Sequence, residues 1–199
     1  MRCIHLVLKR IIDIVGGIFL LILLSPLLLI ITCAVKLNSR GPAFFLQERL
    51  GYRGKVFKII KFRTMVVNAE QMGSGIFTHR QDPRITAVGS LLRNSSLDEL
   101  PQLFNVIKGE MSFVGPRPPL PYHPYTYEAY NDEQKLRFTV RPGITGYAQV
   151  KGRNAISWEE RIKYDVEYVK KFSIFLDIKI LFLTAWGIVR RENIYRKNL

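Results

Sequence analysis

The feature that most constrains this chain is an apolar run of 25 residues, from Ile11 to Val35. About 20 apolar residues are enough for a helix to cross a bilayer, so the run predicts a helical segment in a membrane. Ser25-Pro26 stands near the middle of the run. Proline removes one helical hydrogen bond, and the serine hydroxyl can bond to a carbonyl that is left free. The pair therefore predicts a bend at depth.

Positive charge flanks the run on both sides, with Lys9 and Arg10 before it and Lys36 and Arg40 after it. Because cations favour the cytoplasmic side, a re-entrant segment of two helices that enters and leaves by the same face satisfies both ends. An ordinary kinked spanning helix fits these residues equally well. Asp13 lies four residues after Lys9 and three after Arg10, which predicts an ion pair with one of them at head-group depth.

The composition predicts that this protein binds an anionic partner. The chain has 199 residues, with 30 Lys and Arg against 16 Asp and Glu, and a net charge of +14. Such an excess favours phospholipid head groups, nucleic acid or a polyanionic substrate. The two cysteines lie in or beside the apolar run, and the three histidines are scattered. A disulfide framework, a thiolate or histidine metal cluster and a nucleophile–histidine pair therefore have no support.

The middle of the chain predicts a small β-hairpin. Strand-like residues from Ala43 to Leu50 and from Lys55 to Thr64 flank a turn at 51–54, and the second strand is strongly basic. The polar, glycine-containing stretch from Asn68 to Gly75 predicts a mobile loop. We therefore expect an α+β fold, mainly α with one small hairpin.

The C-terminal part predicts two helices. Ser157 and Glu160 have the spacing of a capping box, and the helix that they open is expected to end near Lys171. The last apolar run, from Phe172 to Val189, contains charged residues, including Asp177. Charges make a spanning helix unfavourable, so we expect an amphipathic helix that lies on a membrane or against the core.

Two adjacent carboxylates, Asp98 and Glu99, lie between Arg93 and Arg117, a grouping that suits phosphate and a divalent metal. Ser96 completes a capping-box spacing with Glu99 ahead of an apolar run, so the acids are expected to open a helix. The free N–H groups at such a start attract anions. On this pair alone, acids that merely complement the helix dipole are the commoner explanation.

The segment around Arg117 is expected to be stiff. Pro116, Pro118 and Pro119 each fix their own φ and restrict the residue before them. An extended segment of this kind can hold the Arg117 guanidinium in one place.

Taken together, these residues resemble the monotopic phosphoglycosyl transferases, bacterial sugar transferases that start glycan assembly on a polyprenyl-phosphate carrier. The resemblance covers nearly the whole chain, and the order and spacing of its motifs make it specific. In chain order, the motifs are Lys9-Arg10 with Asp13, Ser25-Pro26, Lys61 to Met65, Ser96 to Leu103, Asn105 to Pro118, Arg141 to Gly146 and Gly152-Arg153-Asn154.

The resemblance implies a small, catalytic-domain-only member at the cytoplasmic face of the bacterial inner membrane. Residues 1–38 would form a re-entrant membrane anchor, and residues 39–199 a membrane-associated catalytic domain with amphipathic interfacial helices. The anchor residues are Lys9, Arg10, Asp13, Ser25 and Pro26.

The resemblance also implies a reaction. Asp98 attacks the β-phosphate of a UDP-sugar, UMP leaves, and polyprenyl (undecaprenyl) phosphate then takes the sugar phosphate from the enzyme. Asp98 and Glu99 are expected to hold Mg²⁺, and the expected substrate contacts are Arg93 and Arg117 for phosphoryl oxygens, and Lys61, Arg63 and Arg153 for the nucleotide or diphosphate.

The net charge also fits a function of another class, a membrane-tethered module that binds anionic lipid or nucleic acid without turnover. Such a module needs neither Asp98 nor Glu99. The motif set favours the enzyme, with a UDP-sugar, a polyprenyl phosphate and a phospholipid membrane as partners and no nucleic acid.

Overall fold

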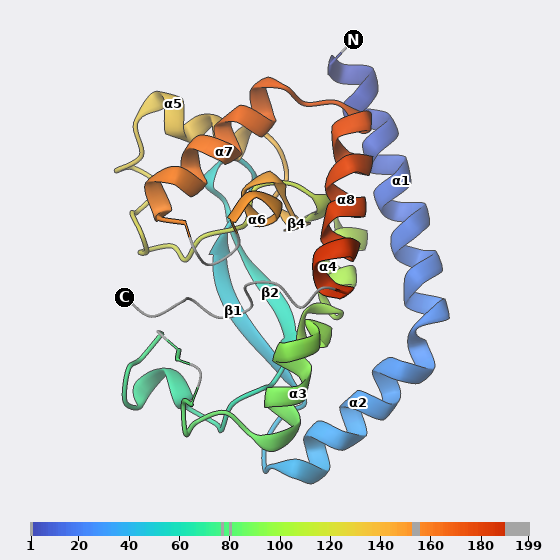
Figure 1. The fold of residues 1–199 in the computed structure, drawn as a ribbon, viewed down its shortest axis with the longest axis vertical. Helices are drawn as coiled ribbons and strands as arrows, with labels where there is room; N and C mark the ends of the chain where they lie inside the picture. The colour runs from blue at the N-terminus through green and yellow to red at the C-terminus, as the bar shows by residue number, and fades with distance from the viewer. Residues whose placement is uncertain (1, 77, 80, 153–155, 190–199) are drawn as a thin grey trace.

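The computed structural model describes residues 2–76, 78–79, 81–152 and 156–189. The chain is mainly helical with a small antiparallel hairpin, as the sequence predicts (Figure 1). The hairpin consists of β1 (Phe44–Leu50) and β2 (Val56–Phe62). A second sheet, in which β3 (Ser112–Val114) pairs in parallel with β4 (Gly143–Thr145), was not predicted. Strands of three residues are too short to show a period-2 pattern.

Two helices with a bend between them form the N-terminal part of the fold. They are α1 (Arg2–Leu23) and α2 (Ser25–Asn38). The later helices are α3 (Ala87–Ser95), α4 (Gln102–Lys108), α5 (Asp132–Lys135), α6 (Tyr147–Gly152), α7 (Trp158–Lys170) and α8 (Ile174–Val189). In Figure 1 the hairpin runs through the middle of the molecule, and α1 and α2 follow one of its sides.

The predicted break between α1 and α2 is confirmed. The two helices are bent by 63°. The Ser25 hydroxyl donates to the carbonyl of Ile22 at 2.8 Å, the group that would accept from residue 26 if Pro26 had an N–H. Proline therefore opens the helix, and the serine satisfies the carbonyl that it frees.

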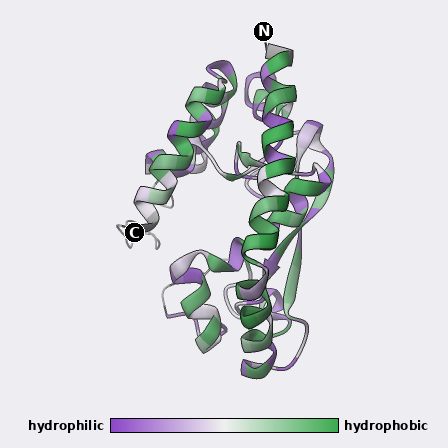
Figure 2. Ribbon diagram, turned by 90° about the vertical axis from the view of Figure 1, so that its right-hand side faces the viewer, coloured by the Kyte–Doolittle hydropathy of each residue, from purple (hydrophilic) through white to green (hydrophobic). Residues whose placement is uncertain are grey.

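The helix pair α1–α2 exposes many large apolar side chains, including Ile11, Phe19 and Ile30. Much of its ribbon in Figure 2 has the green of hydrophobic residues. Within the described residues, no helix is by itself long and apolar enough to cross a bilayer. The bent pair has the required length and composition when both helices are counted.

The predicted ion pair of Asp13 with Lys9 or Arg10 is wrong. Asp13 is buried, and its Oδ1 accepts hydrogen bonds from the Ser112 hydroxyl and the Phe113 N–H, both at 3.0 Å. Spacing along one helix identifies neighbours on its surface. It does not reveal partners that the fold brings from about 100 positions away.

Lys9 and Arg10 likewise bind later parts of the chain. The Lys9 ammonium donates to Asp177 of α8 at 2.5 Å, and both side chains are largely buried. Arg10 donates to the carbonyls of Val106 and Ile107, at 2.6 and 2.8 Å, near the C-terminal end of α4, where free carbonyls favour a cation. These contacts fasten α1 to the rest of the domain.

The loop predicted to be mobile is organised around one arginine. Arg84 donates to the carbonyls of Ala69, Met72 and Gly75 at 2.7 Å each, and it pairs with Asp82 at 2.6 Å. Because one guanidinium binds three carbonyls of the loop, the loop has a defined path.

The two C-terminal helices agree with the sequence. Ser157 and Glu160 form the predicted capping box at the start of α7. In α8, Asp177 and Ile180 are buried, which confirms a face packed against the core. The opposite side exposes large apolar residues, among them Phe175. Its contact with a membrane stays a prediction.

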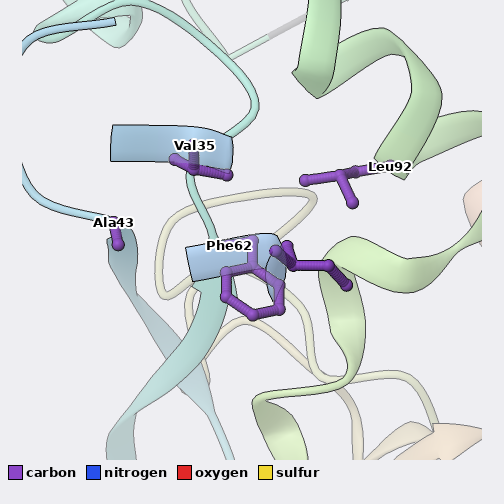
Figure 3. Close-up of a cluster of buried hydrophobic side chains, with 5 residues drawn as sticks. Val35, Ala43, Phe62 and Leu92 are labelled. Carbon is purple, nitrogen blue, oxygen red and sulfur yellow. The ribbon is translucent and has the colours of Figure 1, made fainter. Parts of the chain in front are cut away.

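A cluster of buried side chains joins α2, the hairpin and α3 (Figure 3). Its members are Ile31, Val35, Ala43, Phe62 and Leu92. The cluster lies directly beside the segment that contains the two adjacent carboxylates, since Leu97 and Leu100 pack against it.

Candidate active site

Asp98 and Glu99 lie in a 3-10 turn, Leu97–Glu99, between α3 and α4. The expected capping box is wrong. Ser96 has a left-handed φ of 58° and ends α3, and α4 begins only at Gln102. The dyad therefore lies in the connection between two helices rather than in the first turn of one.

Glu99 has stronger partners than a backbone N–H. Its Oε1 accepts from the Lys61 ammonium at 2.7 Å and from the Arg117 guanidinium at 2.9 Å. Burial would raise the pKa of Glu99, but the charges of Arg117 and Lys61 together hold it well below its usual range. Glu99 is thus a permanent anion, and its two partners come from the hairpin and from the proline-rich segment.

Asp98 has the opposite environment. Burial raises the pKa of Asp98 to about 6, with the charge of Lys61 opposing the shift and that of Glu99 adding to it. None of the described residues donates a hydrogen bond to its carboxylate. This pKa is below 7, so the carboxyl group is mainly ionised at neutral pH. Asp98 is therefore a carboxylate with free lone pairs, as a nucleophile or a metal ligand requires.

Arg93 offers a donor beside the dyad. Its Nη2 donates to the Thr78 hydroxyl at 3.1 Å, whereas its Nη1 is buried and has no hydrogen-bond partner. Its charge also lowers the pKa of Asp98, after the larger effects named above. A buried donor without a partner is costly in free energy. A phosphoryl oxygen of a bound substrate that accepted from this nitrogen would remove that cost.

Other arginines hold the segment around Arg117 from two sides, and its stiffness stays a prediction. Residues 115–119 form no regular secondary structure. The carbonyl of Arg117 accepts from Arg137 at 3.0 Å, and the carbonyl of Pro118 accepts from Arg49 at 3.1 Å. These contacts fix the position from which Arg117 reaches Glu99.

Sequence reasoning missed this group of buried arginines. Arg137 forms an ion pair with Asp165 at 2.6 Å, and both side chains are 1% exposed. Burial and the charge of Arg117 lower the pKa of Arg49 and of Arg161 to about 10 each. Among 30 cationic residues, nothing in the sequence separates the buried ones from the solvated ones.

One of the expected substrate contacts, Arg63, lies elsewhere. The Arg63 side chain is 5% exposed, and its guanidinium donates to backbone carbonyls at the end of α2, including that of Ser39 at 2.7 Å. We therefore correct its expected role from nucleotide contact to structural contact. Arg153 lies outside the described residues.

The donor set of the dyad fits a hard divalent cation. Asp98 and Glu99 supply carboxylate oxygens, and Mg²⁺ typically binds through one or two carboxylates together with phosphate oxygens. The described part of the chain contains no group of three or more His, Cys, Asp or Glu side chains that could hold a metal. A metal here would take its remaining ligands from a substrate and from water.

Comparison with known proteins places this geometry in context. The sequence profile of the bacterial sugar transferases matches residues 4–191. The chain is 45% identical over 194 residues to the uncharacterized sugar transferase EpsL of Bacillus subtilis, and the alignment covers 97% of this chain and 93% of that protein.

Two further relatives are the UDP-glucose:undecaprenyl-phosphate glucose-1-phosphate transferase of Klebsiella pneumoniae, 46% identical over 195 residues, and the undecaprenyl-phosphate galactose phosphotransferase of Salmonella typhimurium, 42% identical over 202 residues. The alignments cover 95% and 94% of this chain but 42% of each relative. The profile match extends over nearly the whole chain and includes the dyad and its cationic partners. This protein therefore belongs to the bacterial sugar transferase family.

Proposed function

We propose that this protein transfers a sugar 1-phosphate from a UDP-sugar to a polyprenyl phosphate such as undecaprenyl phosphate, and that UMP is released. This would be the first membrane step in the assembly of a glycan such as an exopolysaccharide. The observation that supports it best is the contrast within the dyad. Glu99 is a buried anion bound by two cations, and Asp98 beside it is a carboxylate without a donor. The names of the relatives point to the same reaction class.

In the proposed mechanism, an oxygen of Asp98 attacks the β-phosphorus of the UDP-sugar. A bond from this oxygen to phosphorus forms, the bond from phosphorus to the bridging oxygen breaks, and UMP leaves with the electron pair. An oxygen of the polyprenyl phosphate then attacks the same phosphorus and releases Asp98 as a carboxylate. A covalent step of this kind divides one difficult displacement into two easier ones.

The cations of the site would bind and orient the phosphoryl groups. Arg117 reaches the dyad from a stiff segment, and Arg93 has a buried nitrogen ready to donate. Asp98 and Glu99 would hold Mg²⁺, which screens the charge between a carboxylate and the phosphates that it must approach.

The decisive experiment uses the wild-type protein without lipid acceptor. With Mg²⁺ and a panel of UDP-sugars, beginning with UDP-glucose and UDP-galactose, we expect release of one UMP per enzyme. Mass spectrometry should show the added mass of one sugar phosphate, and steady-state kinetics with polyprenyl phosphate should be ping-pong. Intersecting kinetics, with neither UMP nor adduct until lipid is added, would leave Asp98 a metal ligand only.

Arg117→Lys should slow turnover about tenfold to a hundredfold. An ammonium cannot reproduce the planar, two-pronged grip of a guanidinium on phosphoryl oxygens. Losing one charge-assisted hydrogen bond costs roughly 1.5–3 kcal/mol, which corresponds to this range. The measurement is the rate of UMP release with saturating Mg²⁺. Wild-type turnover in this variant would remove Arg117 from the phosphate site.

We further propose that α1–α2 is a re-entrant anchor, with both ends of the chain at the cytoplasmic face of the bacterial inner membrane. The bend at Ser25-Pro26 supports this arrangement. Pro26→Ala should restore the helical hydrogen bond to Ile22, straighten the pair and let a fraction of the molecules span, with loss of activity.

Labelling of Arg2→Cys in a Cys3→Ser, Cys33→Ser background measures this topology. The cysteine should react only from the cytoplasmic side, and adding Pro26→Ala should make part of it reactive from the periplasmic side. Periplasmic labelling of the variant that retains Pro26 would contradict the re-entrant arrangement.

A further inference from the structure

Three consecutive residues at the end of β2 face three different parts of the protein. Lys61 binds Glu99 of the dyad at 2.7 Å. Phe62, only 1% exposed, packs in the cluster that joins α2 to α3 (Figure 3). Arg63 donates to the end of α2. Three consecutive residues therefore connect the dyad to the helix pair α1–α2.

The Arg63 guanidinium closes the C-terminal end of α2. It donates to the carbonyls of Ser39, at 2.7 Å, of Val35, at 3.4 Å, and of Arg40. The last carbonyls of a helix have no partner within the helix, and a cation at that end is favoured by the helix dipole. Of the three accepting carbonyls, only that of Val35 belongs to α2, and those of Ser39 and Arg40 lie in the turn that follows it. The buried guanidinium therefore fastens the last turn of α2 and the turn after it to the end of the hairpin.

Gly41 makes room for this contact. Its φ is +120°, a value that residues with a side chain rarely adopt. A Cβ at this position would collide with the Arg63 guanidinium and with Val67. The turn after α2 is thus shaped around the arginine.

We infer that Arg63 is a positioning residue that sets the place of the helix pair α1–α2 relative to Asp98 and Glu99. Because Lys61, Phe62 and Arg63 are consecutive, the strand end that places the Lys61 ammonium against Glu99 also fixes the place where α2 ends. This inference rests on the proposed function. It gives Arg63 a role in the second half-reaction only, the transfer of the sugar phosphate from the enzyme to the polyprenyl phosphate. The UDP-sugar reaches the dyad from solution, whereas the polyprenyl phosphate must be delivered from the membrane in which α1–α2 lies.

The two half-reactions can be measured separately in membrane nanodiscs. In Arg63→Met, formation of the sugar-phosphate adduct should stay within about twofold of wild type. Transfer from the isolated adduct to polyprenyl phosphate should slow about tenfold to a hundredfold, the scale expected when a reacting group is misplaced by roughly 1 Å. Gly41→Ala should reproduce this selective loss, and Arg63→Lys should restore part of the second rate.

Arg84→Met is the matched control. Arg84 is also a buried arginine that donates to three backbone carbonyls, but these belong to the loop 69–75. This variant should show no selective loss of the second half-reaction. Equal slowing of both half-reactions in Arg63→Met, or the same selective loss in Arg84→Met, would overturn the inference.

A distance measurement tests the inference without any activity. Spin labels are placed on the exposed Cys33 of α2 and on Lys58→Cys in β2, with Cys3 replaced by Ser. The distance distribution should broaden in Arg63→Met and stay narrow in Arg84→Met. An unchanged distribution in Arg63→Met would reject the positioning role. Absence of an adduct in the wild-type enzyme would instead reject the proposed mechanism.

Discussion

Asp98→Asn should abolish the sugar-phosphate adduct and lower UMP release on the order of 10⁴-fold or more, the scale seen when a catalytic nucleophile is removed. A neutral amide is a poor nucleophile and a weaker metal ligand than a carboxylate. The loss should appear in the first half-reaction, before any lipid is added. The measurements are intact-protein mass after incubation with UDP-sugar and Mg²⁺, and release of UMP in a single turnover.

The control for this prediction is Asp132→Asn, which makes the same chemical change at an exposed position at the start of α5. Its adduct yield should match that of wild type. Circular dichroism of both variants separates loss of the nucleophile from loss of the fold. An adduct on folded Asp98→Asn protein would show that another residue attacks the phosphorus.

Glu99→Gln should slow UMP release about 10²- to 10³-fold, the size of effect found when one electrostatic contact of a transition state is removed. The substitution leaves the Lys61 ammonium and the Arg117 guanidinium without their shared anion. Both side chains are at most one-third exposed, so the unpaired charges should also lower the melting temperature. Adduct should still form on long incubation, because Asp98 is intact.

A Mg²⁺ titration separates the metal role of Glu99 from its role in binding cations. If Glu99 is a ligand, Glu99→Gln should need a higher Mg²⁺ concentration for half-maximal activity. Glu128→Gln, at an exposed carboxylate, is the control and should behave as wild type. The same Mg²⁺ requirement in Glu99→Gln and wild type would restrict Glu99 to orienting Lys61 and Arg117.

Local chemistry in the sequence was sufficient for several parts of this protein. The bend at Pro26 follows from a missing N–H group, and the Ser25 hydroxyl was near enough in sequence to satisfy the freed carbonyl. The capping box at Ser157 likewise depends on residues three positions apart. In each case, the partners are within a few residues, so the sequence specifies the contact.

Contacts between distant residues were decided by the tertiary structure. Ser96 and Glu99 have the spacing of a capping box, yet Glu99 binds Lys61 and Arg117, because two cations stabilise a buried carboxylate more than one backbone N–H does. The environment that separates Asp98 from Glu99 arises only when β2 and the proline-rich segment meet at the dyad.

The same reason explains Asp13 and Arg63. The partners of Asp13 were expected from its neighbours in sequence, and the role of Arg63 from the family resemblance. Both residues bind groups that only the fold brings close, the Ser112 hydroxyl for Asp13 and the end of α2 for Arg63. The sequence by itself determined which residues could do chemistry and where the chain bends. Which of the charges are buried, and which partner each one has, depends on packing, since the cost of burying an ion is met only by the specific groups that surround it.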